Sequence, residues 1–406
     1  MNRITGDKPC LKICNTNLEF LLKVAKYHYI NRSPQKEKNF PDKWNLAKSA
    51  SVLLSSLAVC TDERTIDFVF EFIKEYTNSE NSKIKESVLM SYGSILDSTH
   101  RKRIKEIIEG SLPTLMNMLS DKSFDVRTTV SWVIKKICKY HTDIIIYLQN
   151  NNPVLLDNFI QTLIKHLNSN KKVVMNLIES INLLAVNCKN IKGENYNTSI
   201  LSKYYQIIFD NLVLVAYTQE AITSENNIAV NAFFTISSLI ETAPYDVLTL
   251  IQGYFSQFVN LLMETKEISK FQNDEQRLLY QEYLCSVISS YLMEEKTSLN
   301  MDQAKYIFEI VKSFFLERGT VFETGISLCS SIALNIGKNF KELIEEYGNF
   351  LYVALGMWNA ELICKSAIMS VSDLIRALGS DFDPYIDQII PVVFNIIQVN
   401  YHHYLY

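Results

Sequence analysis

The sequence has 406 residues and a formal net charge of −4 at neutral pH, so no global field favours nucleic acid or a strongly cationic partner. Hydrophobic residues make up 48% of the chain, which is ample for a core, whereas only 11 glycines and 8 prolines are present. A chain this poor in turn-forming residues is not expected to be an all-β protein, and its composition favours many helices joined by short polar turns.

The predicted elements alternate along the chain between an amphipathic helix and a second, more apolar helix. The first pair is residues 18–29 and 44–59, joined by the polar, proline-containing segment 31–43. The pairs that follow are 69–76 with 84–96, 113–119 with a helix from about 124, 156–167 with 173–185, 207–217 with 228–240, 255–263 with 278–292, 304–315 with 322–334 and 347–357 with 362–378. A lone first helix, 385–397, comes last, and longer loops are expected at 189–199 and 264–274.

Residues 123–140 show the helix pattern best, and Asp121 or Ser123 is suited to cap this helix. Apolar side chains recur three and four residues apart, which is the spacing of one buried helix face: Val126, Val130, Val133, Ile134 and Ile137. Trp132 lies away from much of this face, beside Lys135 and Lys136. It is therefore either packed between neighbouring helices or displayed to a partner.

The repeated pair of helices predicts the fold. The spacing of the pairs is roughly 38–55 residues, in the range of HEAT and armadillo repeats, and Asp125–Val126–Arg127 is typical of a HEAT turn. We therefore expect an all-α solenoid, a right-handed superhelix of about eight hairpins that forms one continuous array over residues 1–406. Neither end carries a clear capping sequence, so the chain is expected to be a window of a longer solenoid or a shortened relative of one.

The sequence gives no sign of catalysis or of a bound cofactor or metal. It contains no glycine-rich phosphate loop, HExxH or GxSxG motif, and its histidines lack acidic or thiol neighbours at ligand spacing. We therefore do not expect an enzyme. His402–His403 could chelate a stray metal ion, but a frayed terminus is the favoured interpretation of the pair.

The cysteines and the hydropathy point to the expected compartment. Four cysteines fall inside apolar helical runs and are predicted to be buried free thiols of a reducing compartment: Cys60, Cys138, Cys329 and Cys364. The amino terminus lacks the apolar region of a signal peptide, and no stretch reaches the roughly 18 apolar residues of a membrane span. A soluble intracellular chain without membrane insertion is therefore expected.

Three segments resemble a known family in order and spacing. They are DKWNLAKSASVLLSSLAVCTDE (42–63), SLPTLMNMLSDKSFDVRTTVSWVIKKIC (111–138) and AELICKSAIMSVSDLIRALGSDFDPYID (360–387). They resemble the central repeats of the importin-β (karyopherin-β1) nuclear import receptors, and the similarity runs from about Asn17 to Gln398. The chain would then correspond to the central half of such a receptor.

The resemblance implies a concave surface lined by the second helices, where tryptophans stack on the basic helix through which importin-α binds. Trp44 and Trp132 match two of the family's tryptophan positions. At the third position this chain has Glu179, while Asn176 keeps the preceding asparagine. The indole faces would attract arginine or lysine, and a carboxylate at the third position would pair with them instead.

Further second-helix residues would complete this surface. Glu86, Glu179 and Glu282 are candidates to supply negative charge, and Asn176 and Asn231 could bond the peptide backbone. The alternatives are an ordinary solvated helix face for the glutamates and tolerated surface positions for the asparagines.

The implied function is a nuclear import receptor that carries importin-α or a basic cargo helix through nuclear pores, between cytoplasm and nucleus. The family also binds Phe-Gly nucleoporins and the Ran GTPase. Its acidic loop, which contacts Ran, is replaced here by a segment in which Glu37 and Asp42 face Lys36, Lys38 and Lys43, and the family's amino-terminal repeats are absent. Ran binding is therefore expected to be weakened. The rival interpretation is a HEAT-repeat scaffold of another assembly, of the phosphatase-scaffold or coat-adaptor type.

Overall fold

The computed structural model describes residues 14–31, 44–192, 196–217, 228–267, 271, 273–294, 297–316, 320–357 and 359–403. The predicted loop 31–43 lies, beyond Asn31, outside these residues. The chain divides into two compact units, residues 1–231 and 232–406, with the division inside helix α14. Continuity of one superhelix across this division stays a prediction.

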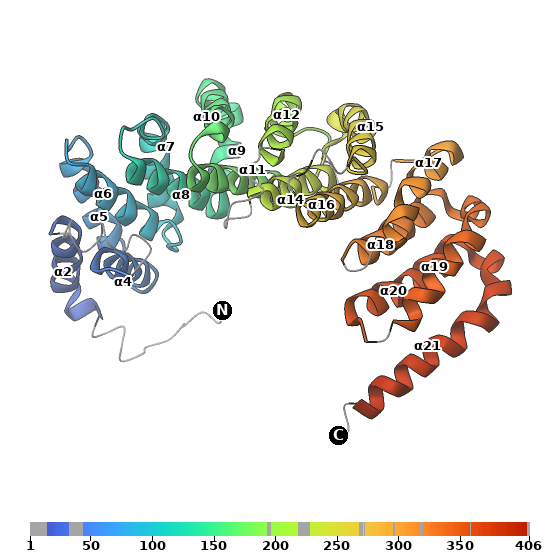
Figure 1. Cartoon of the computed structure of the whole chain (residues 1–406). Helices are drawn as coiled ribbons and strands as arrows, with labels where there is room; N and C mark the ends of the chain where they lie inside the picture. Colours follow the sequence, from blue (N-terminus) through green and yellow to red (C-terminus); the bar gives the residue numbers. More distant parts are fainter. Residues whose placement is uncertain are drawn as a thin grey trace. The chain divides into compact units, whose positions relative to one another are not determined.

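The first unit is a stack of helical hairpins in two layers (Figure 1). The first-helix layer contains α2 (Leu18–Ile30), α5 (Arg64–Tyr76), α7 (Arg101–Met118), α10 (Pro153–Lys165) and α12 (Tyr205–Ala216). The second-helix layer contains α4 (Leu46–Cys60), α6 (Ser82–Ile95), α8 (Phe124–Tyr140), α11 (Lys171–Lys192) and the start of α14 (Ile228–Glu241). Helix α9 (Thr142–Asn151) and the short helices η1 (His166–Asn168) and η2 (Ser202–Tyr204) connect them. In the first-helix layer α2 packs on α5, α5 on α7, α7 on α10 and α10 on α12. In the second-helix layer α4 packs on α6, α6 on α8 and α8 on α11, as in a solenoid.

The second unit continues the same alternation of first and second helices. Its first helices are α15 (Leu248–Glu264), α17 (Met301–Lys312), α19 (Ile344–Gly356) and α21 (Asp383–His403). Its second helices, after the end of α14, are α16 (Asp274–Leu292), α18 (Thr320–Ile336) and α20 (Glu361–Leu378). The short helices η3 (Tyr245–Val247), η5 (Ser313–Leu316), η6 (Gly337–Glu342) and η7 (Gly379–Phe382) complete it. Over the described residues the prediction of an all-α solenoid of eight hairpins and a lone last helix is confirmed.

The core lies between the two layers of each unit, where the apolar faces of neighbouring hairpins meet. Helix α8 shows this clearly, because the five residues predicted from its spacing are all fully buried: Val126, Val130, Val133, Ile134 and Ile137. Such a face contributes roughly 1.5–3 kcal/mol per buried aliphatic side chain. The spacing of the apolar residues therefore predicted correctly which face of α8 is buried.

Two predicted boundaries were wrong in the same hairpin region. Helix α7 begins at Arg101 and not at Pro113, which lies inside it. The buried face of Ile104, Ile107 and Leu112 holds this helix together although Pro113 lacks the N–H of an ordinary helical residue. Helix α9 was not predicted at all, and α11 continues four residues into the predicted loop at 189–199.

The turn before α8 links neighbouring hairpins by charge. Asp121 Oδ1 accepts from the Ser123 backbone N–H at 2.8 Å, and Arg127 Nη1 donates to the Asp121 carbonyl at 2.6 Å. Asp121 thus braces the turn, whereas the Ser123 side chain makes no cap bond. Lys85 reaches Asp121 at 3.0 Å across the hairpin boundary. This arrangement explains the need for Arg127 in the HEAT-like turn.

The cysteine prediction was wrong at one position. Cys138, Cys329 and Cys364 are buried free thiols as predicted, but Cys60 is exposed at the last turn of α4. Among the described residues no helix is both long and apolar enough to cross a bilayer, and no group of three potential ligand residues could hold a metal ion.

Candidate partner-binding surface

The second-helix layer of the first unit carries the site residues predicted on α4, α6, α8 and α11. Trp44 precedes α4 and is 68% exposed. Its Nε1–H donates to Ser49 Oγ at 2.7 Å, and Asn45 caps the helix through the Lys48 backbone N–H at 2.9 Å. The capped turn therefore fixes the indole while leaving much of its surface open to solvent.

An exposed apolar ridge continues from Trp44 along α4. Val52 is 53% exposed and Val59 is 48% exposed, seven residues further on the same side of the helix. Ser56 lies between them and is also exposed. Lys48, one turn before Val52, borders this ridge, and the exposed valines beyond it are a feature of a contact surface.

Trp132 is in a different environment. It is half-buried on α8, and its six-membered ring covers Gly93 of the neighbouring helix α6 so closely that a Cβ on Gly93 would lie 2.1 Å from Cζ3. Lys136 Nζ lies 5.2 Å from the centre of the same indole ring, one turn further along α8. The ring is thus packed between two second helices and already contacts a cation of its own chain.

Lys136 is held firmly in this position. Its Nζ donates to the Gly93 carbonyl at 2.6 Å and lies 3.8 Å from Asp97, which in turn accepts from Ser55 of α4 at 3.1 Å. Burial lowers the pKa of Lys136, while nearby Asp97 opposes this shift. A chain of polar contacts therefore joins α4, α6 and α8 beneath the exposed surface.

The two predicted α11 residues are also engaged with α8. Glu179 pairs with Lys135 at 3.1 Å, and its side chain remains 53% exposed. Asn176 donates through Nδ2 to Ser131 Oγ at 3.0 Å. Both residues thus face the α8 side of the layer, where they bind the chain itself.

The remaining predicted residues lie further apart. Glu86 pairs with Lys83 at 3.4 Å and its side chain is largely buried. Asn231 is half-buried in α14, at the end of the first unit. Glu282 is half-buried in α16 of the second unit. The structure therefore gathers Trp44, Glu86, Trp132, Asn176 and Glu179 in one layer and leaves Glu282 outside that unit.

Sequence reasoning placed Lys135 and Lys136 beside Trp132 but missed the contact of Lys136 with the ring and the close approach of the ring to Gly93. Lys136 stands four residues after Trp132, the spacing at which two helical side chains meet, so its contact was readable from the sequence. Gly93 lies 39 positions away, and nothing local indicated that Trp132 would cover it. Of the three lysines near the end of α8, Lys139 is exposed, whereas Lys135 pairs with Glu179 and Lys136 lies between α8 and α6.

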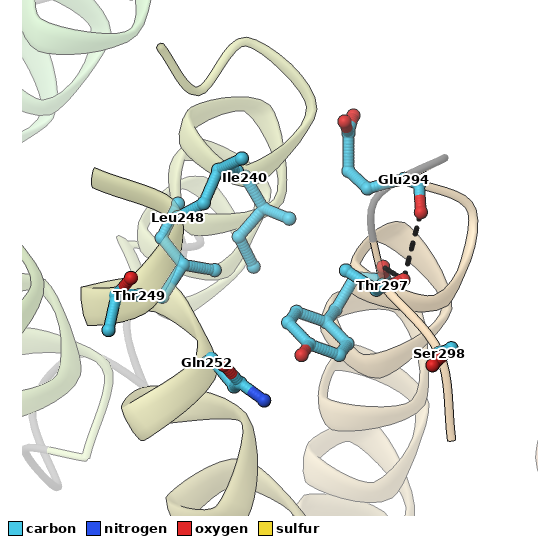
Figure 2. A pocket seen from close by; sticks show the side chains of 9 residues that line it. Ile240, Leu248, Thr249, Gln252, Glu294, Thr297 and Ser298 are labelled. Carbon is cyan, nitrogen blue, oxygen red and sulfur yellow. Dashed lines mark hydrogen bonds between the residues drawn. The ribbon is translucent and has the colours of Figure 1, made fainter. Parts of the chain in front are cut away.

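Each unit contains a cavity. An open cavity of about 640 Å³ lies between α10 and α12 of the first unit, and four of its nine lining residues are amides: Asn158, Gln161, Asn168 and Asn211. A smaller cavity of about 190 Å³ lies in the second unit, beside Tyr291 and Glu294 (Figure 2). Besides uncharged side chains, the first cavity is lined by Lys165 and the second by Glu294.

Comparisons with known proteins agree on one family. A family model described as importin subunit beta-1-like, TPR repeats, matches residues 158–404, and a HEAT repeat model matches residues 112–141. Importin subunit beta-1 of Schizosaccharomyces pombe is 23% identical over 352 residues, which cover 85% of this chain and 40% of that protein. The Saccharomyces cerevisiae protein of the same name is 24% identical over 375 residues, which cover 89% of this chain and 41% of that protein.

Solved structures show the same fold. A crystal structure of importin beta in an ammonium sulfate condition superposes with a TM-score of 0.80 at 19% identity, over 97% of this chain and 44% of that one. The structure of yeast importin-beta (Kap95p) superposes with a TM-score of 0.80 at 19% identity, over 98% of this chain and 44% of that one. The chain thus spans about two fifths of the length of the curated relatives it matches. Since the first family model covers more than half of its residues, the chain belongs to the importin subunit beta-1-like family.

Proposed function

We propose that this chain is a nuclear transport receptor rather than an enzyme, and that it holds a basic helical segment of importin-α or of a cargo on its second-helix surface. Family membership supports the transport role. The observation that carries the site is Trp44, an exposed indole fixed in place by Ser49 on the ridge that continues through Val52 and Val59. Such a ring offers a large apolar face that also attracts cations.

The other predicted residues have unequal parts in this proposal. Trp132 and Glu179 contribute less than Trp44, because Lys136 and Lys135 of the chain already contact them. Glu86, Asn176, Asn231 and Glu282 remain proposed secondary contacts. Binding is sensitive to salt, since it depends on lysine and arginine side chains near carboxylates and indoles.

Solved relatives suggest further partners. One similar structure is a Kap95:Nup1 complex, another is Kap95p with RanGDP, and Kap121p has been solved with Ste12p and with Ulp1p. By analogy we include a nucleoporin, Ran and protein cargo among the proposed partners, with passage between cytoplasm and nucleus. Segment 31–43 has four basic residues and two acidic ones, so it lacks the excess of negative charge of the family's acidic loop, which argues for weaker Ran binding than in the family.

The test is the affinity of the full chain for a fluorescent peptide of the importin-α amino-terminal basic helix, at low and high salt. Trp44→Ala is expected to weaken binding by about 2–30-fold, from a cation–π contact of about 0.5–2 kcal/mol. Trp44→Phe keeps an aromatic face, so it should lose less affinity than Trp44→Ala. Tyr352→Ala, which removes an exposed aromatic ring of α19, is the matched control and should leave the affinity unchanged. Equal affinity of wild type and Trp44→Ala would count against the site.

A scaffold of another assembly remains the second candidate. One observation favours it, namely that Trp132 is packed against Gly93 instead of being displayed. Failure of the peptide to bind the wild type at low salt would favour this alternative.

A further inference from the structure

The cavity between α10 and α12 is an open groove in the first-helix layer, where Figure 1 shows the two helices beside each other. It measures about 640 Å³, within the roughly 300–1,000 Å³ of typical ligand pockets. Its described lining residues all lie in α10 and α12 and in the short helices η1 and η2. The walls of the groove are therefore regular helices and not loops.

Four of the lining side chains are carboxamides, and three of them have no partner within the described part of the chain. Asn158, Gln161 and Asn168 are exposed and make no side-chain hydrogen bond there. Asn211 donates from Nδ2 to the Ile207 carbonyl at 2.8 Å, and its Oδ1 remains an acceptor. A carboxamide has an acceptor oxygen and an NH₂ donor, the two functions that a peptide bond also presents. The groove therefore offers hydrogen-bonding groups that are complementary to a polypeptide backbone.

The amides follow the length of α10 at helical spacing. Residues 158, 161, 165 and 168 are three or four positions apart, so they share one face of α10 and η1. The helix axis rises by roughly 15 Å from Asn158 to Asn168. An extended chain advances roughly 3.3 Å per residue, so about four or five of its residues match this row. An α-helix, by contrast, pairs its backbone N–H and C=O groups internally. The row therefore suits an extended segment.

Polar contacts hold the two walls together at one end of the groove. Tyr204 Oη donates to Asp157 Oδ1 at 2.7 Å, and Lys203 forms an ion pair with the same carboxylate. The hydrogen bonds from Lys203 and Tyr204 lower the pKa of Asp157. At the other end α12 packs on η1. The groove is therefore formed before any ligand enters, which lowers the entropic cost of binding.

The groove has little net charge. Lys203 and Asp157 neutralise each other at one end, and Lys165 is the one charged side chain among the described lining residues. The last turn of α10 and the first turn of α12 both border the groove, so partial charges of opposite sign lie along it. Binding here therefore depends on hydrogen bonds, and an uncharged segment avoids the cost of desolvating a charge.

We propose that this groove binds an extended, uncharged segment of a partner polypeptide through its backbone, with peptide groups of the segment paired to the amides of Asn158, Gln161 and Asn168. The proposal does not depend on the proposed function, because a basic helix has no free backbone groups along its length to offer these amides. It assigns a second binding site, on the first-helix layer, to a different class of ligand.

The test uses the full chain with labelled isoleucine methyl groups, observed by NMR during titration with a neutral pentapeptide of alternating alanine and threonine, capped at both ends. The peptide is expected to shift the methyl signals of Ile164 and Ile207, which line the groove, to saturation. An analogue with ester bonds in place of the central amides keeps the shape but lacks their N–H donors, so it should bind about tenfold more weakly or worse. Equal affinity of the ester analogue, or peptide shifts that spare both isoleucines, would overturn the proposal.

Two variants test the amides themselves. Gln161→Met and Asn158→Leu keep the approximate size of the side chain and remove its donor and acceptor, so each should lower the affinity for the pentapeptide by about 2–12-fold. Gln257→Met, which replaces an exposed glutamine of α15 in the second unit, is the matched control and should leave the affinity unchanged. The methyl spectrum reports the fold of each variant. Unchanged affinity in folded Gln161→Met and Asn158→Leu refutes the role of the amides.

The outcome is separable from that of the proposed function. The affinity for the neutral pentapeptide should be insensitive to salt and unchanged in Trp44→Ala, whereas the importin-α peptide should respond to both. If the pentapeptide binds and the importin-α peptide does not, the groove stands and the receptor proposal fails. If the importin-α peptide binds through Trp44 while the pentapeptide leaves Ile164 and Ile207 unmoved, the groove fails alone.

Discussion

The packing of Trp132 on Gly93 predicts an unusual response to a one-carbon change. Gly93→Ala in the interior of α6 should by propensity stabilise the helix by about 0.5–1 kcal/mol. Its Cβ, however, would lie 2.1 Å from Trp132 Cζ3 and 2.6 Å from Cη2, so the indole must shift. Such overpacking costs about 1–3 kcal/mol. We expect net destabilisation, together with disturbance of the Lys136 bond to the Gly93 carbonyl.

Gly110→Ala in α7 is the matched control, because a Cβ there meets nothing within 4 Å. It should stabilise the chain by the propensity gain alone, so the two variants should differ by about 1–3 kcal/mol. The assay is urea unfolding followed by far-UV circular dichroism, compared as midpoints because a repeat array need not unfold in one step. In a Trp132→Ala background, Gly93→Ala should become stabilising. If Gly93→Ala resembles Gly110→Ala in the wild type, the reasoning is refuted.

Two further predictions concern titratable groups. His141 is buried, its Nε2 lies 2.5 Å from the Leu96 carbonyl oxygen, and burial lowers its pKa. As the pH falls, the unfolded chain therefore takes up the proton before the folded chain does. The stability contributed by His141 should be complete above pH ~6.5 and should decrease as the pH drops toward the folded-state pKa. Urea midpoints at pH 8 and pH 5.5 measure this fall, which His141→Gln should reduce and which must persist in the control His28→Gln, at a half-buried histidine of α2. Exposed Cys60 should react rapidly with a thiol reagent in the native state, whereas Cys138 and Cys285, whose pKa burial raises, should react only on unfolding. If the Cys60→Ser variant has as many fast-reacting thiols as the wild type, this assignment is wrong.

The sequence predicted the order of the helices because each hairpin buries a regular apolar face. It placed the start of α7 wrongly because Pro113 was taken as a first-turn residue, although Ile104, Ile107 and Ile108 already carried the helical spacing. Helix α9 is short and contains three consecutive isoleucines, so its pattern does not single out one face. Such elements are defined by the hairpins packed around them, which a local pattern does not describe.

The candidate surface was harder to predict than the fold. The exposure of Trp44 depends on a local cap and on a bond to a residue five positions away, so its position near a helix start was informative. The environment of Trp132 depends on which residue of the neighbouring hairpin lies opposite, and that register is set by packing of whole helices. The groove between α10 and α12 combines residues of α10, η1, η2 and α12, whose meeting no single stretch encodes.

The contact between Lys136 and Trp132 has a consequence for selectivity. A tethered ammonium group acts at an effective concentration of the order of millimolar or more, so an incoming guanidinium must outcompete it before it can share the ring. If a partner does bind at Trp132 as proposed, an isolated cation should compete poorly with Lys136, whereas a basic helix that also makes contacts elsewhere should compete better. The intramolecular contact would then select for partners that bind at several points.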